Sequence, residues 1–461
     1  MWRETRGHVV LRSTRAHRTG APLVSKVHTS VFLEVRVQAS ALAVEPVGDQ
    51  RHQRRHRPPR SAWLVWGVAA VCYFAALFHR ASLGVVAQEA LDRFHTGPAV
   101  LALFSAMQLG VYLALQVPSG LLADRLGPRR VITGGVLALA VGSAVFAVSG
   151  SVLGGIAGRV LIGFGDAFMF TNVLRLAAQW FPADRFGRVA ALTGLAGGLG
   201  QVFSTLPLGT SLHALGWTGT FLGAAALTLA LAVAGWLVIR DRPAGYAPEA
   251  TGQAEGIGHT LKVVVAQRGT RHSFWVHFVL MAQFVAVTTL WGSPWLTDAQ
   301  GHGEAEVGTL LMLCVFGFIA GTWFAGQYIA GRHLRRERFT LGLSVAVVAV
   351  WALLVLWPGT LPMPVLVAAL VVIGIGGGGA MLAFDGARAA NATHRSGAAS
   401  GVVNMGGFTA AVLIQLLVGV VLQAVAWLPA AAAYRWAFAP VLLLLVLGTL
   451  AQASRRQHRA R

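Results

Sequence analysis

The sequence predicts an all-α membrane protein of twelve transmembrane helices in two pseudo-symmetric six-helix bundles. Its 461 residues are 55% hydrophobic and only 12% charged, with a mean hydropathy of +0.63, which is too apolar for a soluble protein of this size. The 55 glycines fit membrane helices, which use small residues for close packing. Landmark residues also recur at nearly one spacing in both halves of the chain, as expected of a duplicated bundle.

Each expected span is an apolar stretch of about 19 to 28 residues, enough for a bilayer core of about 30 Å at about 1.5 Å per residue. The expected spans are 62–88, 98–123, 130–150, 152–178, 187–210, 217–240, 273–296, 305–329, 339–357, 362–386, 397–424 and 434–453. The polar segment 241–272 is the expected cytoplasmic linker between bundles at 61–240 and 273–453, and a short cytoplasmic tail follows at 454–461.

The first 60 residues contain twelve Lys or Arg and no apolar core long enough for a signal peptide. We interpret this segment as a disordered cytoplasmic tail. A start site assigned too far upstream explains it equally well, and the sequence alone leaves both interpretations open.

The net charge of +20 would suit a nucleic-acid partner, but its distribution argues against one. The basic residues fall in alternate short loops, as the positive-inside rule demands, and only Arg93 and Arg435 lie on the other side. We therefore expect a lipid bilayer as the partner, no nucleic acid, and both termini in the cytoplasm.

The segment 119–130, SGLLADRLGPRR, is a short polar hinge between two apolar runs. It fits the pattern G-x-x-x-D-R-x-G-x-R-R and resembles the loop between the second and third helices of major facilitator superfamily (MFS) transporters. The resemblance implies the MFS fold and a loop that holds the cytoplasmic side closed. Alternatively, the arginines only set topology, worth about 1 kcal/mol each near an anionic leaflet. The residues of this gating motif are Gly120, Asp124, Arg125, Gly127, Arg129 and Arg130.

Two landmarks recur at nearly the same offset. Gly120 recurs at Gly326, 206 residues later (326 − 120), and Arg188 recurs at Arg395, 207 residues later (395 − 188). A common offset indicates a duplicated six-helix unit. The second copy has Ala330 where the first has Asp124, so a gating charge at this position is one-sided.

Charged residues inside spans cost at least about 2.5 to 3.5 kcal/mol and persist mainly where they face a partner or a watery cavity. Arg159 and Asp166 lie seven residues apart on the fourth span, so both point to one face. The stretch R-x-x-x-G-x-G from Arg159 resembles the fourth-helix motif of the MFS, which implies a role in proton transfer. We expect proton coupling here, with a purely structural ion pair as the alternative.

Arg80 on the first span resembles the helix-one arginine of the organic-anion branch of the MFS, and Tyr73 lies seven residues earlier. The resemblance implies that both contact the substrate. Snorkelling of Arg80 to the interface is the alternative. The neighbouring His79 points to one side and is expected to be packed.

Uncharged polar residues form stripes on three other spans. Such stripes either line a cavity or join helices through hydrogen bonds, and the sequence favours neither. The substrate-binding candidates in these stripes are Gln108, Tyr112, Gln116, Gln283, Trp291 and Asn404.

Three further features have structural interpretations. Asp385 and Arg388, three residues apart, are expected to form a structural ion pair. The glycines of GIGGGG at 374–379 lack the Lys and Ser or Thr of a phosphate loop and are expected to pack helices. Cys72 and Cys314 lie in apolar runs, and no metal site or cofactor motif is present in the sequence.

The expected function is secondary active transport of a small solute by alternating access. Since the sequence has no nucleotide site, the energy source must be an ion or solute gradient, and the acids inside the membrane favour a proton as the coupling ion. Two arginines at similar depth favour a small organic anion as the substrate. Drug efflux is the alternative, although the fifth span lacks the Gly-Pro pair of many drug antiporters of this superfamily. A non-transporting receptor is less favoured, and an enzyme is not expected. The expected setting is a monomer in a bacterial plasma membrane.

Overall fold

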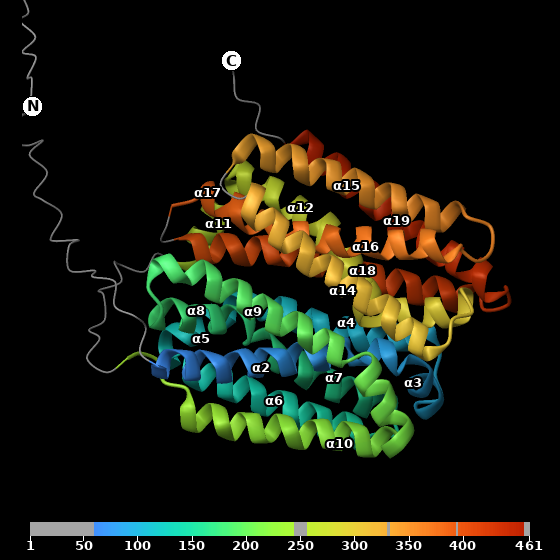
Figure 1. Cartoon of the computed structure of the whole chain (residues 1–461), viewed down its shortest axis with the longest axis horizontal. Coiled ribbons are helices and arrows are strands. Elements are labelled where there is room, and N and C mark those ends of the chain that lie inside the picture. The colour runs from blue at the N-terminus through green and yellow to red at the C-terminus, as the bar shows by residue number, and fades with distance from the viewer. Residues whose placement is uncertain (1–59, 244–255, 330–331, 393–394, 456–461) are drawn as a thin grey trace, which may run out of the picture. The chain divides into compact units, whose positions relative to one another are not determined.

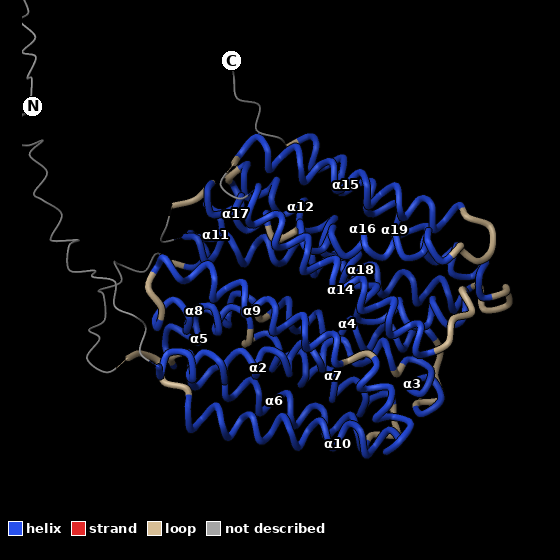
Figure 2. The backbone as a smooth tube through the Cα atoms, in the orientation of Figure 1, coloured by secondary structure: helices blue, strands red, loops and turns tan. Residues whose placement is uncertain are grey.

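The computed structural model describes residues 60–243, 256–329, 332–392 and 395–455, and every regular element in these ranges is a helix (Figures 1 and 2). The expected N-terminal tail, apart from Arg60, lies outside the described residues. Most of the expected linker is also outside them, but its last part forms the short helix α11 (Ile257–Ala266).

The first six expected spans form the N-terminal half, which occupies the lower part of Figure 1. Its helices are α2 (Arg60–Val85), α3 (Ala87–Arg93), α4 (Pro98–Ala114), α5 (Gln116–Leu126), α6 (Pro128–Val148), α7 (Val152–Ala167), α8 (Phe170–Trp180), α9 (Ala183–Phe203) and α10 (Leu206–Val238).

The last six form the C-terminal half above it, which contains three short π-helical segments. Its helices are α12 (Arg268–Ala286), η2 (Val287–Trp291), α13 (Gly292–Pro294), η3 (Trp295–Ala299), α14 (Glu304–Phe324), η4 (Ala325–Ile329), α15 (His333–Leu356), α16 (Met363–Gly379), α17 (Leu382–Ala389), α18 (Ser396–Ala424) and α19 (Ala430–Ser454).

Ten helical spans of the described chain are long and apolar enough to cross a bilayer, or eleven when the bent pair α3 and α4 is counted as one. The fifth expected span, which α9 begins, is not among them; α9 carries Arg188, Gln201 and several glycines. The expected break between the fifth and sixth spans is a sharp kink inside α10 at Gly216, with φ 65°. With α9 included, the arrangement agrees with the twelve expected spans.

The polar hinge of the sequence is a tight turn at Gly127, whose φ of 80° favours glycine. Pro128 then begins α6, a position where its missing N–H costs nothing. Asp241, just after α10, accepts a hydrogen bond from the backbone N–H of Arg129 (2.7 Å). The start of the third span is thereby capped by the end of the sixth. We call the end of the two halves that carries α5, α8, α11 and α17 the basic end (Figure 1, left), and the end that carries α3 the far end.

The glycine-rich stretch of α16 packs against α14, as expected from the sequence. A Cβ at Gly374 would collide with the carbonyl oxygen of Cys314, and one at Gly378 with that of Phe318. This close approach lets the two backbones touch without side chains between them.

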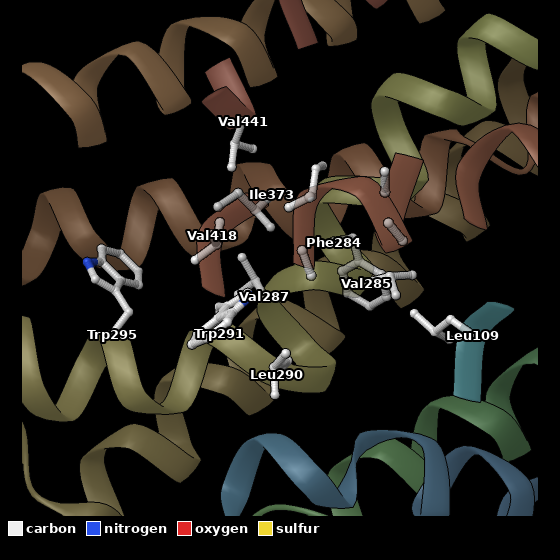
Figure 3. Packing of buried hydrophobic residues seen from close by; sticks show 14 of the residues in the cluster. Leu109, Phe284, Val285, Val287, Leu290, Trp291, Trp295, Ile373, Val418 and Val441 are labelled. Carbon is white, nitrogen blue, oxygen red and sulfur yellow. The ribbon is translucent and has the colours of Figure 1, made fainter. Parts of the chain in front are cut away.

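One cluster of buried apolar residues contains most of those of the C-terminal half and part of those of the N-terminal half, and a second cluster lies wholly within the N-terminal half. Figure 3 shows Trp291 and Leu290 from η2 beside Val418 from α18, with Leu109 from α4 at the edge. The core therefore continues across the junction of the halves.

Candidate functional site

The centre of the site is an ion pair between Arg80 on α2 and Asp166 on α7, which are 86 residues apart in the chain. Arg80 Nε lies 2.7 Å from Asp166 Oδ2, and Arg80 Nη2 lies 2.8 Å from Oδ1. Arg80 is only 6% exposed and Asp166 1%. Two parallel charge-assisted hydrogen bonds in a buried site fix the orientation of the guanidinium. Arg80 therefore does not snorkel to a membrane interface.

Two aromatic rings cover the guanidinium of Arg80. The ring of Tyr112 on α4 lies 4.5 Å from the guanidinium carbon, and the ring of Phe408 on α18 lies 5.1 Å from it. Asn404 on α18 donates its amide N–H to the hydroxyl of Tyr112 (3.2 Å) and to Gln116 Oε1 (3.0 Å). The site thus contains side chains from both halves of the protein.

Arg159, the expected partner of Asp166, binds elsewhere. Its Nη1 donates to the carbonyl oxygen of His79 (3.2 Å) and to Gln108 Oε1 (3.1 Å), and its guanidinium carbon lies 4.2 Å from the ring of Phe146. Seven residues along a helix are about 10.5 Å, so two side chains on the same face need not meet. The pairing inferred from spacing is therefore corrected: Asp166 pairs with Arg80.

The surroundings of Arg159 contain more donors than acceptors. Arg159 is fully buried, and in the described chain its Nε and Nη2 and Gln108 Nε2 have no hydrogen-bond partner. Among the described residues of the N-terminal half, the buried guanidiniums are those of Arg80 and Arg159, and the buried carboxylate is that of Asp166. This imbalance favours an anionic ligand.

Tyr73 on α2 is buried against Phe170 and lies within electrostatic range of Arg80 and Asp166. Two candidates from the polar stripes, Gln283 and Trp291, lie apart from this centre. Gln283 donates to the carbonyl oxygens of Leu280 and Ile373, and the indole N–H of Trp291 donates to that of Gln415. The structure thus places Gln283 and Trp291 in hydrogen bonds inside the C-terminal half.

His79 is fully buried and its Nε2 lies 2.9 Å from the hydroxyl of Thr228, as expected for a packed histidine. Asp385 pairs with Arg336 on α15 (2.9 Å) and not with Arg388, so the expected local ion pair is corrected. Arg388 is exposed, whereas Arg336 is 8% exposed and reaches Asp385 from the neighbouring helix.

Among the residues of the gating motif, Arg129 binds within its own half. Its Nη2 donates to the carbonyl oxygen of Trp236 (2.7 Å), and its guanidinium carbon lies 4.4 Å from that residue's ring. Arg125 and Arg130 are exposed. Gly120 and Asp124 lie on α5, but the side chain of Asp124 is outside the described residues.

Polar contacts also join the two halves at the far end. Gln88 Nε2 on α3 donates to Asp298 Oδ2 on η3 (2.9 Å), and His213 Nε2 on α10 lies 2.5 Å from Glu304 Oε2 on α14. A cavity of about 240 Å³ is lined by Gln88, His213 and Glu304. The far end is therefore bridged between the halves.

Sequence reasoning missed Phe408, the far-end contacts, and the pairing of Arg80 with Asp166. A lone phenylalanine in an apolar helix gives no signal, but Asn404 four residues earlier marks the same helix face. In the described chain, no group of three or more His, Cys, Asp or Glu residues could hold a metal ion.

Known proteins agree with this architecture. Residues 69–415 match the family model "Major Facilitator Superfamily". A multidrug resistance protein B homolog of Mycobacterium tuberculosis is 32% identical over 210 residues, which are 44% of this chain and 38% of that protein. A probable sulfoacetate transporter of Cupriavidus necator is 24% identical over 210 residues, which are 46% of this chain and 47% of that protein. The chain thus matches less than half the length of these relatives.

The fold is shared with a solved structure. A bacterial homolog of the human lysosomal transporter Spinster, in an inward-facing and occupied conformation, superposes with a TM-score of 0.67 at 15% identity, covering 88% of this chain and 100% of that one. The family match covers most of the chain and agrees with its many membrane spans. The chain therefore belongs to the Major Facilitator Superfamily, and it is a multi-pass membrane protein.

Proposed function

We propose that this protein is a secondary active transporter that carries a small organic anion together with protons by alternating access. The observation that carries the proposal is the buried two-point ion pair between Arg80 and Asp166. A substrate carboxylate has the same shape and charge as the carboxylate of Asp166, so both compete for the same guanidinium. A proton decides this competition.

The competition gives a rule for coupling. When Asp166 is ionised, it occupies the guanidinium of Arg80, and a second carboxylate would bring like charges together in a dry site. When Asp166 is protonated, Arg80 is free to bind the substrate. Binding of the anion therefore requires a proton on Asp166, and both move together.

Other side chains support this role. Arg159 adds a second buried positive charge without a described carboxylate partner, which lowers the cost of bringing an anion into the site. Tyr112, Gln116 and Asn404 form a hydrogen-bonded group beside Arg80 and suit the polar part of a small metabolite. We assign Gln108, which accepts a hydrogen bond from Arg159, and Tyr73, which lies on α2 within electrostatic range of Arg80, to the surroundings of these two arginines.

Alternating access requires each end to open in turn. We assign the basic end to the cytoplasm by the positive-inside rule, with both termini there and the protein in a bacterial plasma membrane as a monomer. In this assignment Gly120, Asp124, Arg125 and Arg130 gate the cytoplasmic side. Arg129 and Asp241 join the third and sixth spans, so that the gate moves as part of the N-terminal half.

The proposal is tested with purified protein in liposomes. Uptake of labelled sulfoacetate, tartrate and succinate is measured with an imposed pH gradient, acid outside. We expect accumulation of at least one of these anions in the wild type and a loss of about 30-fold or more in Arg80→Ala, because the buried cation is removed. Arg388→Gln, an exposed arginine in the other half, is the matched control and retains uptake. Uptake that is the same with and without the pH gradient contradicts proton coupling.

Efflux of apolar compounds is the second candidate, because several relatives, among them the multidrug resistance protein B homolog, are named as resistance proteins. The same liposomes separate the two. An exporter of this kind exchanges ethidium for protons. We expect Arg80→Ala to reduce the rate of ethidium transport less than it reduces the rate of anion transport. Ethidium transport without anion transport would replace the first proposal with the second.

A further inference from the structure

Phe408 is the one ring from the C-terminal half that the described structure places over the guanidinium of Arg80. It is 4% exposed and its ring lies 5.1 Å from the guanidinium carbon. It also packs on Tyr112, with 4.5 Å between ring centroids. The ion pair with Asp166 is made inside the N-terminal half, so this ring links the pair to the other half.

Asn404 fixes the position of α18 relative to Tyr112 and Gln116. It lies one turn before Phe408 on α18, so both residues face α4. Its amide binds the hydroxyl of Tyr112 and the side chain of Gln116. Tyr112 is thereby fixed by a bond from the C-terminal half while its ring lies on Arg80. The two halves meet at the ion pair through Asn404 and Phe408.

We propose that Phe408 is a positioning residue that couples the charge state of Arg80 to the movement of the two halves. This inference rests on the proposed function. The attraction between a cation and a ring is greatest when the cation is dry and has no anion beside it. The strength with which Phe408 holds Arg80 therefore depends on whether a carboxylate neutralises the guanidinium.

Three states of the carrier follow from this dependence. With Asp166 ionised and no substrate, the pair is neutral and the hold of Phe408 is weak. With Asp166 protonated and a substrate carboxylate on Arg80, the site is again neutral and the hold is weak. With Asp166 protonated and no substrate, Arg80 is an uncompensated cation and Phe408 holds it most strongly.

The carrier must not reorient across the membrane in this third state, because it would then carry a proton without substrate. A clamp that is strongest in this state prevents proton leak, while the empty and the fully loaded carriers remain free to reorient. Phe408 thus enforces coupling without contacting the proton.

The test is a double-mutant cycle in which the distance between the two halves is measured for each variant. Spin labels at exposed Leu126 and Leu334, 44% and 56% exposed, report the separation of the halves by pulsed electron resonance. Cys72 and Cys314 are buried and are replaced by alanine for labelling. Asp166→Asn imitates the protonated carboxyl, and Phe408→Leu removes the ring. The cycle needs no substrate.

The labels distinguish molecules in which the basic end is open from molecules in which it is closed. We expect Phe408→Leu to change the ratio of these two populations about tenfold in the Asp166→Asn background and less than twofold with Asp166 present. Phe408→Tyr keeps a ring and behaves as wild type. Phe438→Leu removes a buried ring on α19 that packs on Trp351, away from Arg80, and gives no such difference. An equal effect of Phe408→Leu in both backgrounds overturns the inference.

A flux measurement separates this inference from the proposed function. Entry of protons into liposomes is followed with a pH dye in the absence of any organic anion. We expect Phe408→Leu to leak protons about tenfold faster than wild type, and Phe408→Tyr to leak no faster. If wild-type protein carries none of the anions tested but the cycle above shows coupling, the substrate assignment fails and the role of Phe408 stands. If anions are carried and Phe408→Leu leaks protons no faster than wild type, the proposed role of Phe408 is wrong and the proposed function stands.

Discussion

Asp166 accepts two hydrogen bonds from the guanidinium of Arg80, at 2.7 and 2.8 Å, in a site from which both residues are almost fully hidden from solvent. A buried pair of this kind contributes little to stability on balance, because desolvation offsets most of the attraction. Its presence in a membrane protein is therefore better explained by a function that exchanges one partner.

Removal of one partner alone is expected to destabilise the protein. Arg80→Met leaves the carboxyl of Asp166 buried without its cation, at a cost of about 3 to 5 kcal/mol. The double variant Arg80→Met with Asp166→Leu has no unpaired charge, so we expect it to melt at a higher temperature than either single variant. Thermal unfolding in detergent checks this, and losses that simply add in the double variant contradict the pairing.

Neutralisation of Asp166 is expected to free Arg80 permanently. In Asp166→Asn, binding of a transported anion no longer weakens as the pH rises, because no carboxylate returns to compete. The variant still exchanges labelled for unlabelled anion but does not accumulate it in response to a pH gradient. Counterflow and gradient-driven uptake, measured side by side, check this. Gradient-driven accumulation at the wild-type level would assign the proton to another group.

The contact between Gln88 and Asp298 at the far end is expected to break during each cycle. Cysteines at these two positions, joined by a short bifunctional thiol reagent, should stop transport, since the far end then cannot open. Reduction of a cleavable linker restores it. Each single cysteine variant treated in the same way is the control and retains uptake. Transport that survives complete cross-linking rules out opening between these residues.

Asp241 is expected to stabilise the junction of the third and sixth spans as a helix cap. Asp241→Ala removes the acceptor of the Arg129 N–H and should cost about 0.5 to 2 kcal/mol. Gly127→Ala should cost more, because its φ of 80° is strained for alanine and the new Cβ meets the carboxyl of Asp241. Thermal unfolding of both variants gives the order, and the reverse order contradicts this account of the turn.

The glycines of α16 are expected to tolerate no side chain where they touch α14. Gly378→Leu places a Cβ against the backbone of Phe318 and Thr322 and should abolish the folded protein. Gly342→Leu on α15, where nothing lies within 4 Å, is the matched control and folds normally. The yield of monodisperse protein in size-exclusion chromatography compares them. Equal yields contradict the close packing of α14 and α16.

Much of the fold was predictable because the membrane imposes a simple rule on the sequence. Apolar runs of bilayer length and alternate basic loops locate the spans without knowledge of their packing. The glycines of 374–379 likewise predict a close contact between helices. The kink at Gly216 and the breaks at Leu115 and Phe168 depend on local backbone geometry, and run length does not reveal them.

The sequence singles out most residues of the candidate site but not their pairings. Arg80, Asp166, Tyr112, Gln116 and Asn404 stand out because polar groups are costly in a membrane. Which of two arginines meets Asp166 depends on how α2 and α7 cross, and one sequence holds no such information. A phenylalanine in an apolar helix is ordinary, so only the position of Phe408 over Arg80 makes it a candidate.

The central claim is that a substrate carboxylate and a proton replace the Arg80–Asp166 pair together, and proton uptake on binding tests it most directly. Sulfoacetate, tartrate or succinate, whichever is transported, is titrated into weakly buffered protein in detergent at neutral pH while a pH dye records the protons bound. The account predicts about one proton taken up for each anion bound by wild type, and none by Asp166→Asn. Anion binding by wild type without proton uptake, or equal uptake by Asp166→Asn, would contradict it.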